Sequence, residues 1–326
     1  MTSMEASLPI PTLASRPRGE RTAEFLERRG RTVFADSGYW WASIDAGSRS
    51  FLSCSEHLVL PLQPEEVSSI LRRHNGVAAQ YANQDSGADS GVYLQPDRTY
   101  NFEHVQKRMR NFIRKGLQHF TIRPVEKADL SLRGIEINTD TMSRHQVFRD
   151  EFSDPELWNR NVEAIYGMEG TVCMGAYQDG LLVGYVYGVI DDGILFLMVQ
   201  KSTNTALELH ANPALLFETC RAAFASGQVR AISLGTVPFL NSPNLHHFKT
   251  RMGFELHPYK MRIQLHPVLE PFAHPGLLSF LANHASKLPK IGARLEYHAK
   301  LLKLGRGYNT QPLVEASTEA TEHAGS

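Results

Sequence analysis

The stretch TVCMGAYQDGLLVGYVYGVIDDGILFLMVQ, residues 171–200, decides the fold. Apolar runs within it have the length and composition of strands. Asp-Gly pairs at 179–180 and 192–193 separate these runs, and Asp-Gly between apolar runs is the strongest short-range signal for a hairpin. The stretch therefore predicts three strands joined by two tight turns. The predicted strands are 171–177, 181–190 and 194–200.

The chain downstream of this stretch alternates between helix and strand. A helix is predicted where Asn212 can act as the cap, Pro213 fits the first helical position and Gly227 can end the helix. The elements that follow are a buried strand over 229–234, a short helix from the cap Ser242 to Gly253, and a strand over 254–264. This order of elements predicts an α/β fold.

The chain before residue 171 supplies a second group of elements. The predicted strands are 32–34, 39–44, 51–52, 77–81, 91–94 and 120–123, and the predicted helices are 63–74 and 100–118. Further helices are predicted over 128–138, 142–152 and 157–166, with a break at 138–140. The helix over 100–118 carries its apolar residues at helical spacing and its basic residues on the other faces, which taken alone is typical of a solvated basic helix face.

Composition sets the general class of the protein. A length of 326 residues leaves room for two domains, and a formal net charge of zero argues against a dedicated nucleic-acid binder. Its 3 cysteines are scattered without metal-ligand spacing, which predicts reduced thiols and a cytoplasmic protein. No apolar run reaches the roughly 18–20 residues that span a bilayer, so no transmembrane segment is expected.

Two motifs resemble those of a known family. The segment FKTRMGF, residues 248–254, resembles the closing helix and strand of GNAT-type acyltransferases, in which a tyrosine usually precedes the glycine by four residues. Lys249 holds that position here, and a Phe-Lys pair at this place resembles the FemAB-like branch, which transfers aminoacyl groups. The segment KRMRNFIRKG, residues 107–116, resembles the basic helix that closes the first of two GNAT-like halves in that branch.

The resemblance implies an α/β fold of tandem GNAT-like mixed sheets flanked by helices. We expect the strands of 171–200 to share one sheet with the strands that start near Val229 and Phe254, and residues 34–124 to form a second sheet of the same kind. The expected organisation is a disordered 1–22, a first half over 23–125, a second half over 126–268, a basic amphipathic helical extension over 269–308, and a disordered 309–326.

The connection before the second-half helix bears on the donor. GNAT enzymes hold the pyrophosphate of coenzyme A with a glycine-rich loop at a helix N-terminus. Residues 200–213 occupy that place here, contain no glycine, and end in Pro213, which lacks an N–H donor. The segment favours a donor other than free acetyl-CoA. The donor substrate is expected to be aminoacyl-tRNA or acyl-CoA, and no further cofactor is assigned.

Candidate site residues follow from the chemistry of acyl transfer to an amine. By resemblance, Lys249 is the cation that stabilises the oxyanion, with a solvated helix lysine as the alternative. Glu208 and His210, just before a helix, are candidates for the base or the amine anchor. The candidates for substrate binding are Tyr185, Tyr187, Arg144, His145, Arg110, Arg114 and Lys115. The adjacent His246 and His247 cannot easily face one metal, so no metal site is assigned.

These features together predict an acyl or aminoacyl transferase of the FemAB-like kind with an amine-bearing acceptor and, as a donor partner, charged tRNA. One alternative is a coenzyme A-dependent GNAT N-acyltransferase, and another is a non-catalytic GNAT-like protein that binds a partner or a nucleotide sugar. The basic amphipathic stretch 276–306 could contact the inner surface of a membrane or pack on the domain. The expected location is therefore cytoplasmic, with peripheral membrane contact as an option.

Overall fold

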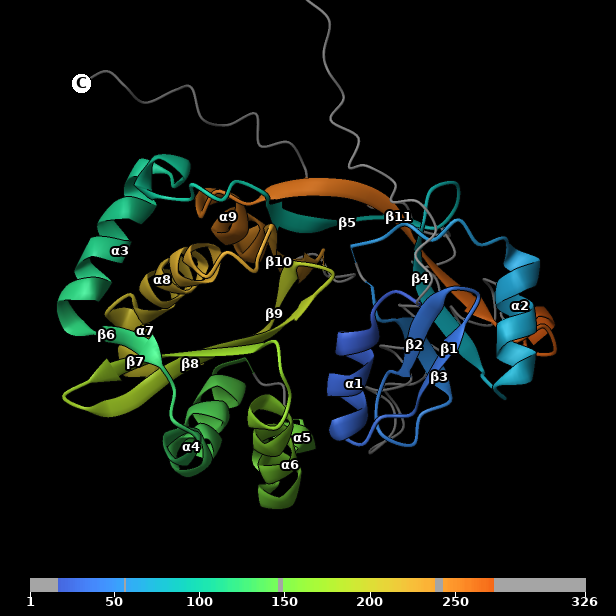
Figure 1. The fold of residues 1–326 in the computed structure, drawn as a ribbon, viewed down its shortest axis with the longest axis horizontal. Helices are drawn as coiled ribbons and strands as arrows, with labels where there is room; N and C mark the ends of the chain where they lie inside the picture. The colour runs from blue at the N-terminus through green and yellow to red at the C-terminus, as the bar shows by residue number, and fades with distance from the viewer. Residues whose placement is uncertain (1–16, 56, 146–148, 238–242, 273–326) are drawn as a thin grey trace, which may run out of the picture.

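A computed structural model describes residues 17–55, 57–145, 149–237 and 243–272. Within them the chain forms one mixed sheet of eleven strands, in the order β1-β2-β3-β4-β11-β5-β10-β9-β8-β7-β6 (Figure 1). The sheet is covered by helices on both faces, which confirms the predicted α/β class with GNAT-like mixed sheets flanked by helices.

The N-terminal part contributes one end of this sheet. Its elements are α1 (Glu20–Arg28), β1 (Val33–Asp36), β2 (Tyr39–Ser43), β3 (Ser50–Ser53), α2 (Pro64–Arg73), β4 (Ala78–Asn83) and β5 (Ala88–Gln95). Helix α1 was not predicted, and its first three residues, 20–22, lie in the segment expected to be disordered. Its buried face, Ala23, Phe25 and Leu26, packs in the core beside β8 (Leu181–Asp191).

The predicted hairpins are present. Strands β7 (Thr171–Gln178), β8 and β9 (Ile194–Ser202) pair in antiparallel order. Both Asp-Gly turns have positive φ at each residue: 49° and 82° at Asp179 and Gly180, and 49° and 73° at Asp192 and Gly193. These are the values of the type I′ turn that matches the twist of paired strands.

The expectation of two separate sheets is wrong. Strand β11 (Glu255–Leu265) pairs with both β4 and β5, and β5 also pairs with β10 (Ala231–Thr236). The first-half strands therefore extend the sheet of the second half, while β6 (Thr121–Pro124) pairs with β7 at the far edge. A separate sheet would leave unpaired backbone groups at two further edges, and joining the halves through β11 and β5 satisfies them.

Helices cover both faces of the central strands. On one face lie α3 (Lys107–His119) and α8 (Ala211–Ala225), and on the other lie α1, α4 (Lys127–His145) and α6 (Pro155–Tyr166), as Figure 1 shows. The shorter elements are η1 (Phe102–His104), α5 (Asp150–Ser153), α7 (Asn204–Glu208), α9 (Pro243–Arg251) and η2 (Glu270–Phe272). Successive side chains of β8 point to opposite faces of the sheet, so each face can bury its own layer of helices. Tyr185 and Tyr187 face α4 and α6, and Val186 faces α8.

Several helix boundaries differ from the predicted ones. Helix α4 runs through Asn138 without the predicted break, because the Asn138 side chain donates to the Phe152 carbonyl oxygen at 3.0 Å instead of competing with its own helix. His210, not Asn212, is the N-cap of α8. Helix α3 begins at Lys107, seven residues later than predicted.

Several expectations fall on residues outside the described ranges. They are the disorder expected over 1–16 and 309–326, the Ser242 cap, and the helical extension beyond residue 272 with its amphipathic stretch 276–306. In the part of the chain that is described, no helix combines the length and apolar character needed to cross a membrane.

Candidate active site

The site begins where two parallel strands separate. Strands β9 and β10 are paired from Ile194 and Ala231 as far as Phe196 and Ser233, and no pairing between them continues in the described residues. Next to this point β9 carries a bulge opposite Tyr187 and Gly188 of β8, and β10 has an irregular register against β5 after Ser233. The bends separate the two strands and leave facing backbone groups without a ladder partner.

A pocket of about 770 Å³ opens at this separation. Residues 196–201 of β9 and 234–236 of β10 form one side of it. The rest of its lining comes from α1, β3, α4 and α5 with their connections, namely Thr22, Leu26, Arg29, Arg31, Leu52, Cys54, Thr141, Met142, His145, Arg149, Glu151 and Phe152. The pocket therefore joins the N-terminal segment to the second half of the chain.

Positive charge gathers around one carboxylate in the pocket. Glu151 forms a 2.7 Å ion pair with Arg29, and lies 3.8 Å from Arg31 and 3.6 Å from Arg149. Lys201 on β9 is 8% exposed, and its Nζ lies 3.9 Å from the centre of the Phe152 ring. Burial, together with the charge of Arg149, lowers the pKa of Lys201 to about 8.

His145 reaches this pocket with its side chain. It is the last residue of α4, lies exposed at the pocket lining, and was among the predicted substrate-binding residues. Desolvation and the neighbouring positive charge of Arg144 lower the pKa of His145 below its ordinary 6.5. At neutral pH the imidazole is therefore uncharged, as a general base must be.

Lys249 lies next to the pocket, not in its lining. It is 6% exposed, and its Nζ donates to the carbonyl oxygen of Thr236 at 3.4 Å and lies 4.3 Å from the centre of the Tyr93 ring. Thr236 ends β10 and lines the pocket. The lysine thus points to the end of β10 and reaches the pocket at the backbone of one residue.

A loop from the first half holds the end of the helix that carries Lys249. Gln95 donates to the carbonyl oxygen of Gly253 at 2.6 Å, and Tyr100 donates to that of Met252 at 2.7 Å. The backbone N–H of Gln106 donates to the carbonyl oxygen of Arg251 at 3.0 Å. Three successive carbonyls, from the last residue of α9 to the second residue after it, are therefore satisfied by one loop, which fixes the end of the helix.

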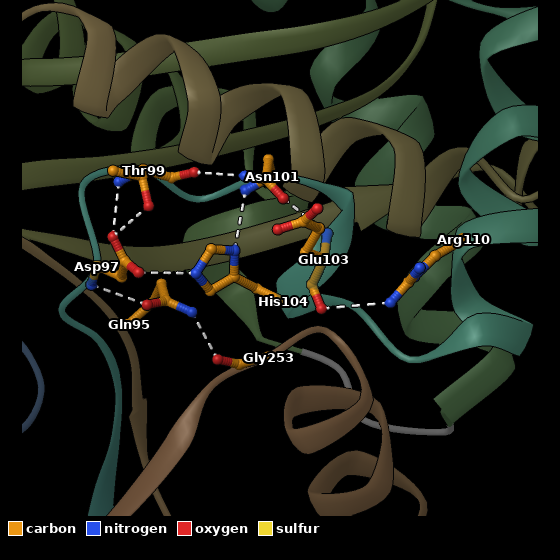
Figure 2. A network of polar contacts seen from close by, with 8 residues as sticks. All are labelled: Gln95, Asp97, Thr99, Asn101, Glu103, His104, Arg110 and Gly253. Atoms are coloured by element: carbon orange, nitrogen blue, oxygen red, sulfur yellow. Dashed lines mark hydrogen bonds and ion pairs between the residues drawn. The ribbon is translucent and has the colours of Figure 1, made fainter.

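The same loop is braced internally, as Figure 2 shows. His104 contacts the carboxylate of Asp97 at 2.8 Å and accepts from the backbone N–H of Asn101 at 3.2 Å. Gly253 has a φ of 88°, and a Cβ there would lie 2.5 Å from the His104 carbonyl oxygen, so this position needs glycine. Arg110, predicted to bind substrate, instead donates to the carbonyl oxygens of Val105 at 2.6 Å and Glu103 at 3.3 Å.

Replacing Tyr100 with Phe is expected to destabilise the fold by about 1–3 kcal/mol, because the Met252 carbonyl loses its buried donor. The free energy of unfolding in urea measures this loss. Tyr187→Phe is the matched control, since the buried Tyr187 hydroxyl has no hydrogen-bond partner in the described residues and its removal costs little. Equal stability of Tyr100→Phe and the wild type would show that the loop does not clamp α9.

The other predicted residues lie away from the pocket. Tyr185 and Tyr187 are core residues at 0% and 1% exposure and do not line it, because they pack under α4 and α6. Arg144 donates to the Asn204 side chain at 2.5 Å instead of lining the pocket. Glu208 is exposed at the end of α7, and His210 stacks on Phe112 at 4.3 Å.

The two remaining predicted cations lie on the exposed side of α3. Arg114 contacts Asn111 at 3.3 Å and lies 5.0 Å from the centre of the Phe102 ring, and Lys115 is exposed. The helix packs on α8 through Gly116, where a Cβ would lie 2.5 Å from the His210 carbonyl oxygen. This contact explains the small residue that ends the basic motif.

Of the pocket lining, His145 was selected from the sequence and the charged residues were missed. These are Arg29, Arg31, Arg149, Glu151 and Lys201. The available signal was weak: Arg29 and Arg31 belong to an arginine-rich run at 28–31, and Lys201 is a single lysine ending an apolar strand. No group of three or more metal-ligating side chains occurs among the residues with described positions.

Comparison with known proteins places the fold. No protein-family model matches the sequence, and no curated protein matches it. Solved structures do match: FemX superposes with a TM-score of 0.56 at 10% identity, covering 79% of this chain and 95% of FemX. L-PGS from Bacillus licheniformis superposes with a TM-score of 0.52 at 10% identity, covering 91% of this chain and 100% of that one.

A third match is the C-terminal domain (DUF2156) of a protein designated a lysylphosphatidylglycerol synthetase from Agrobacterium fabrum. It superposes with a TM-score of 0.53 at 14% identity, covering 75% of this chain and 87% of that domain. The chain therefore has the FemAB-like, GNAT-type α/β fold that its two motifs predicted.

Proposed function

We propose that the protein is an acyl or aminoacyl transferase that moves an activated acyl group to an amine. The observation that carries this proposal is the separation of β9 from β10, which opens a pocket of about 770 Å³ onto unpaired strand edges. Unpaired backbone N–H and C=O groups beside a pocket can hydrogen-bond to the carbonyl and amino groups of a bound donor, as they would to an additional strand.

The pocket holds groups suited to the chemistry. The acceptor amine must be uncharged to attack, and neutral His145 can take its proton directly or through one water. The nitrogen–carbon bond then forms while the carbon–oxygen bond of an ester, or the carbon–sulfur bond of a thioester, breaks. The leaving oxygen or sulfur takes up a proton, so the reaction needs no oxidant or further cofactor.

Lys249 is the group we assign to the developing oxyanion. Its ammonium lies at the carbonyl of Thr236, where β10 ends in the pocket, and the clamp around 251–253 holds its helix in place. A cation that is already fixed in place beside the pocket stabilises negative charge without having to reorganise. The role agrees with the resemblance of the Phe-Lys pair to the FemAB-like branch.

The connection between β9 and α8 supports an aminoacyl-tRNA donor. Helix α7 occupies this connection, His210 caps α8 in a left-handed conformation with φ of 65°, and Pro213 lacks an N–H. The first turn of α8 is therefore a poor cradle for a pyrophosphate. Helix α3 carries no acidic residue, and its exposed Lys107, Arg108, Arg114 and Lys115 could meet the phosphates of the tRNA.

Coenzyme A is accordingly expected to give little protection against heat. A ligand at about 100 times its dissociation constant would stabilise the fold by roughly 2.7 kcal/mol, which raises the melting temperature by several degrees. Melting curves with micromolar to millimolar coenzyme A measure this directly. A clear shift at micromolar coenzyme A, together with transfer from acyl-CoA but not from aminoacyl-tRNA, would favour the coenzyme A-dependent alternative.

A further inference from the structure

Three arginines in the pocket share a single carboxylate, and a lysine lies in the same pocket. Glu151 is committed to Arg29, whose Nη2 lies 2.7 Å from Oε2, and Arg29 also donates to the side chain of Asn161. Arg31 and Arg149 reach the same carboxylate only at 3.8 Å and 3.6 Å. These four cations and one anion leave an excess of three positive charges.

Two of these cations are buried with few polar contacts. The Arg31 side chain is 14% exposed, and within the described chain its guanidinium makes no hydrogen bond beyond the long contact to Glu151. Lys201 is 8% exposed, with the Phe152 ring as its close contact and no ion pair among the described residues. Burial lowers the pKa of both groups, as expected where charge is poorly compensated.

The excess positive charge around these cations indicates that the pocket binds an anion. A guanidinium presents a planar fork of donors that matches the oxygens of a phosphate, and several guanidinium groups can share one phosphate. A phosphate monoester neutralises up to two of the three charges, whereas a carboxylate or a phosphodiester neutralises one. The fork geometry therefore favours phosphate over carboxylate, and the excess charge favours a monoester most.

We propose that Arg31, Arg149 and Lys201 form a subsite for a phosphate group carried by the acceptor amine. The pocket is far larger than a phosphate, so the group belongs to a larger molecule that extends toward the separated strands. Its assignment to the acceptor rests on the proposed function and on His145, the base, which lines the same pocket. Phosphate binding itself does not depend on that function.

Binding of O-phosphoethanolamine, a soluble amine phosphate, tests the subsite without any donor. By isothermal titration the full-length wild type is expected to bind it, and ethanolamine without phosphate is expected to bind at least tenfold more weakly. Arg31→Met should weaken binding of O-phosphoethanolamine about 10- to 100-fold, because it removes a charge-assisted contact. Arg28→Met is the matched control: this arginine is exposed on α1, pairs with Glu24, and should leave binding unchanged.

Melting curves supply a second readout. Without ligand, Arg31→Met is expected to melt at or above the wild-type temperature, because it relieves repulsion, and inorganic phosphate should stabilise the wild type more than the variant. If Arg31→Met fails to fold, Arg149→Met replaces it, since that side chain is 63% exposed. Equal binding by wild type and variant, or no binding by the wild type, would overturn the subsite.

Two further experiments are needed. One distinguishes a lipid phosphate from a soluble one, and the other distinguishes failure of the subsite from failure of the proposed function. Arg31-dependent binding to phosphatidylethanolamine vesicles would indicate a lipid headgroup, and binding of O-phosphoethanolamine alone would indicate a soluble acceptor. Phosphate binding without acyl transfer would remove the transferase proposal and leave the subsite. Transfer with the same KM for amines with and without phosphate would remove the phosphate subsite and leave the transferase proposal.

Discussion

Replacement of Lys249 by Met is expected to lower the rate of acyl transfer about 100- to 1000-fold, the usual cost of losing one oxyanion-stabilising group. Methionine has a similar length and can keep the contact with the Tyr93 ring, so the fold should persist. The variant loses the ammonium that lies 3.4 Å from the Thr236 carbonyl oxygen. Single-turnover rates and melting curves measure the two effects separately.

Lys260→Met provides the control for this experiment. Lys260 lies on β11, is 40% exposed, and pairs with Asp89 on the neighbouring β5, outside the pocket. Its replacement should leave the transfer rate within a few-fold of the wild type. If Lys249→Met transfers as fast as Lys260→Met, Lys249 has only a packing role and the Phe-Lys motif carries no catalytic meaning here.

Replacement of His145 by Gln is expected to slow transfer by about 100-fold or more, the lower range for loss of a general base. Protonated His145 cannot accept a proton, so the wild-type rate should fall as the pH decreases through the pKa of His145. Burial lowers that pKa, which places this fall below pH 6.5. The Gln variant should lack the fall, because it has no group that titrates there.

The control for His145 is His119→Gln, at the exposed end of α3. It should keep both the wild-type rate and the wild-type pH profile. If the rate of His145→Gln still falls as the pH decreases, the fall is caused by a group other than His145. His145 would then be a substrate contact at most.

Local signals made the second half of the fold predictable. The Asp-Gly turns specify hairpins within a few residues, and residues 171–200 form the predicted strands with ends shifted by at most two residues. The pairing of β5 with β11 joins segments about 160 residues apart, and no turn residue encodes it. Periodicity along a strand shows which face is buried but does not identify the neighbouring strand.

The sequence likewise indicated one part of the candidate site and not the other. Lys249 could be selected because it belongs to a contiguous motif beside the helix stop at Gly253, although its catalytic role is still a prediction. The arginine cluster could not, because Arg29 and its partner Glu151 are 122 residues apart and α1 itself was overlooked. Tyr185 and Tyr187 were suggested by alternation alone, which does not distinguish a core face from a pocket wall.

Acyl transfer by a protein with a filled pocket tests the central claim most directly. Leu234 lines the pocket at the point where β10 leaves β9 and is only half-buried, so Leu234→Trp should occupy the space without unfolding the sheet. The assay follows ¹⁴C from a mixture of aminoacyl-tRNAs to O-phosphoethanolamine and to amines without phosphate. The account predicts labelled amide with the wild type and a loss of at least 100-fold with Leu234→Trp at an unchanged melting temperature. Undiminished transfer by Leu234→Trp, or no transfer by the wild type from either aminoacyl-tRNA or acyl-CoA, would contradict it.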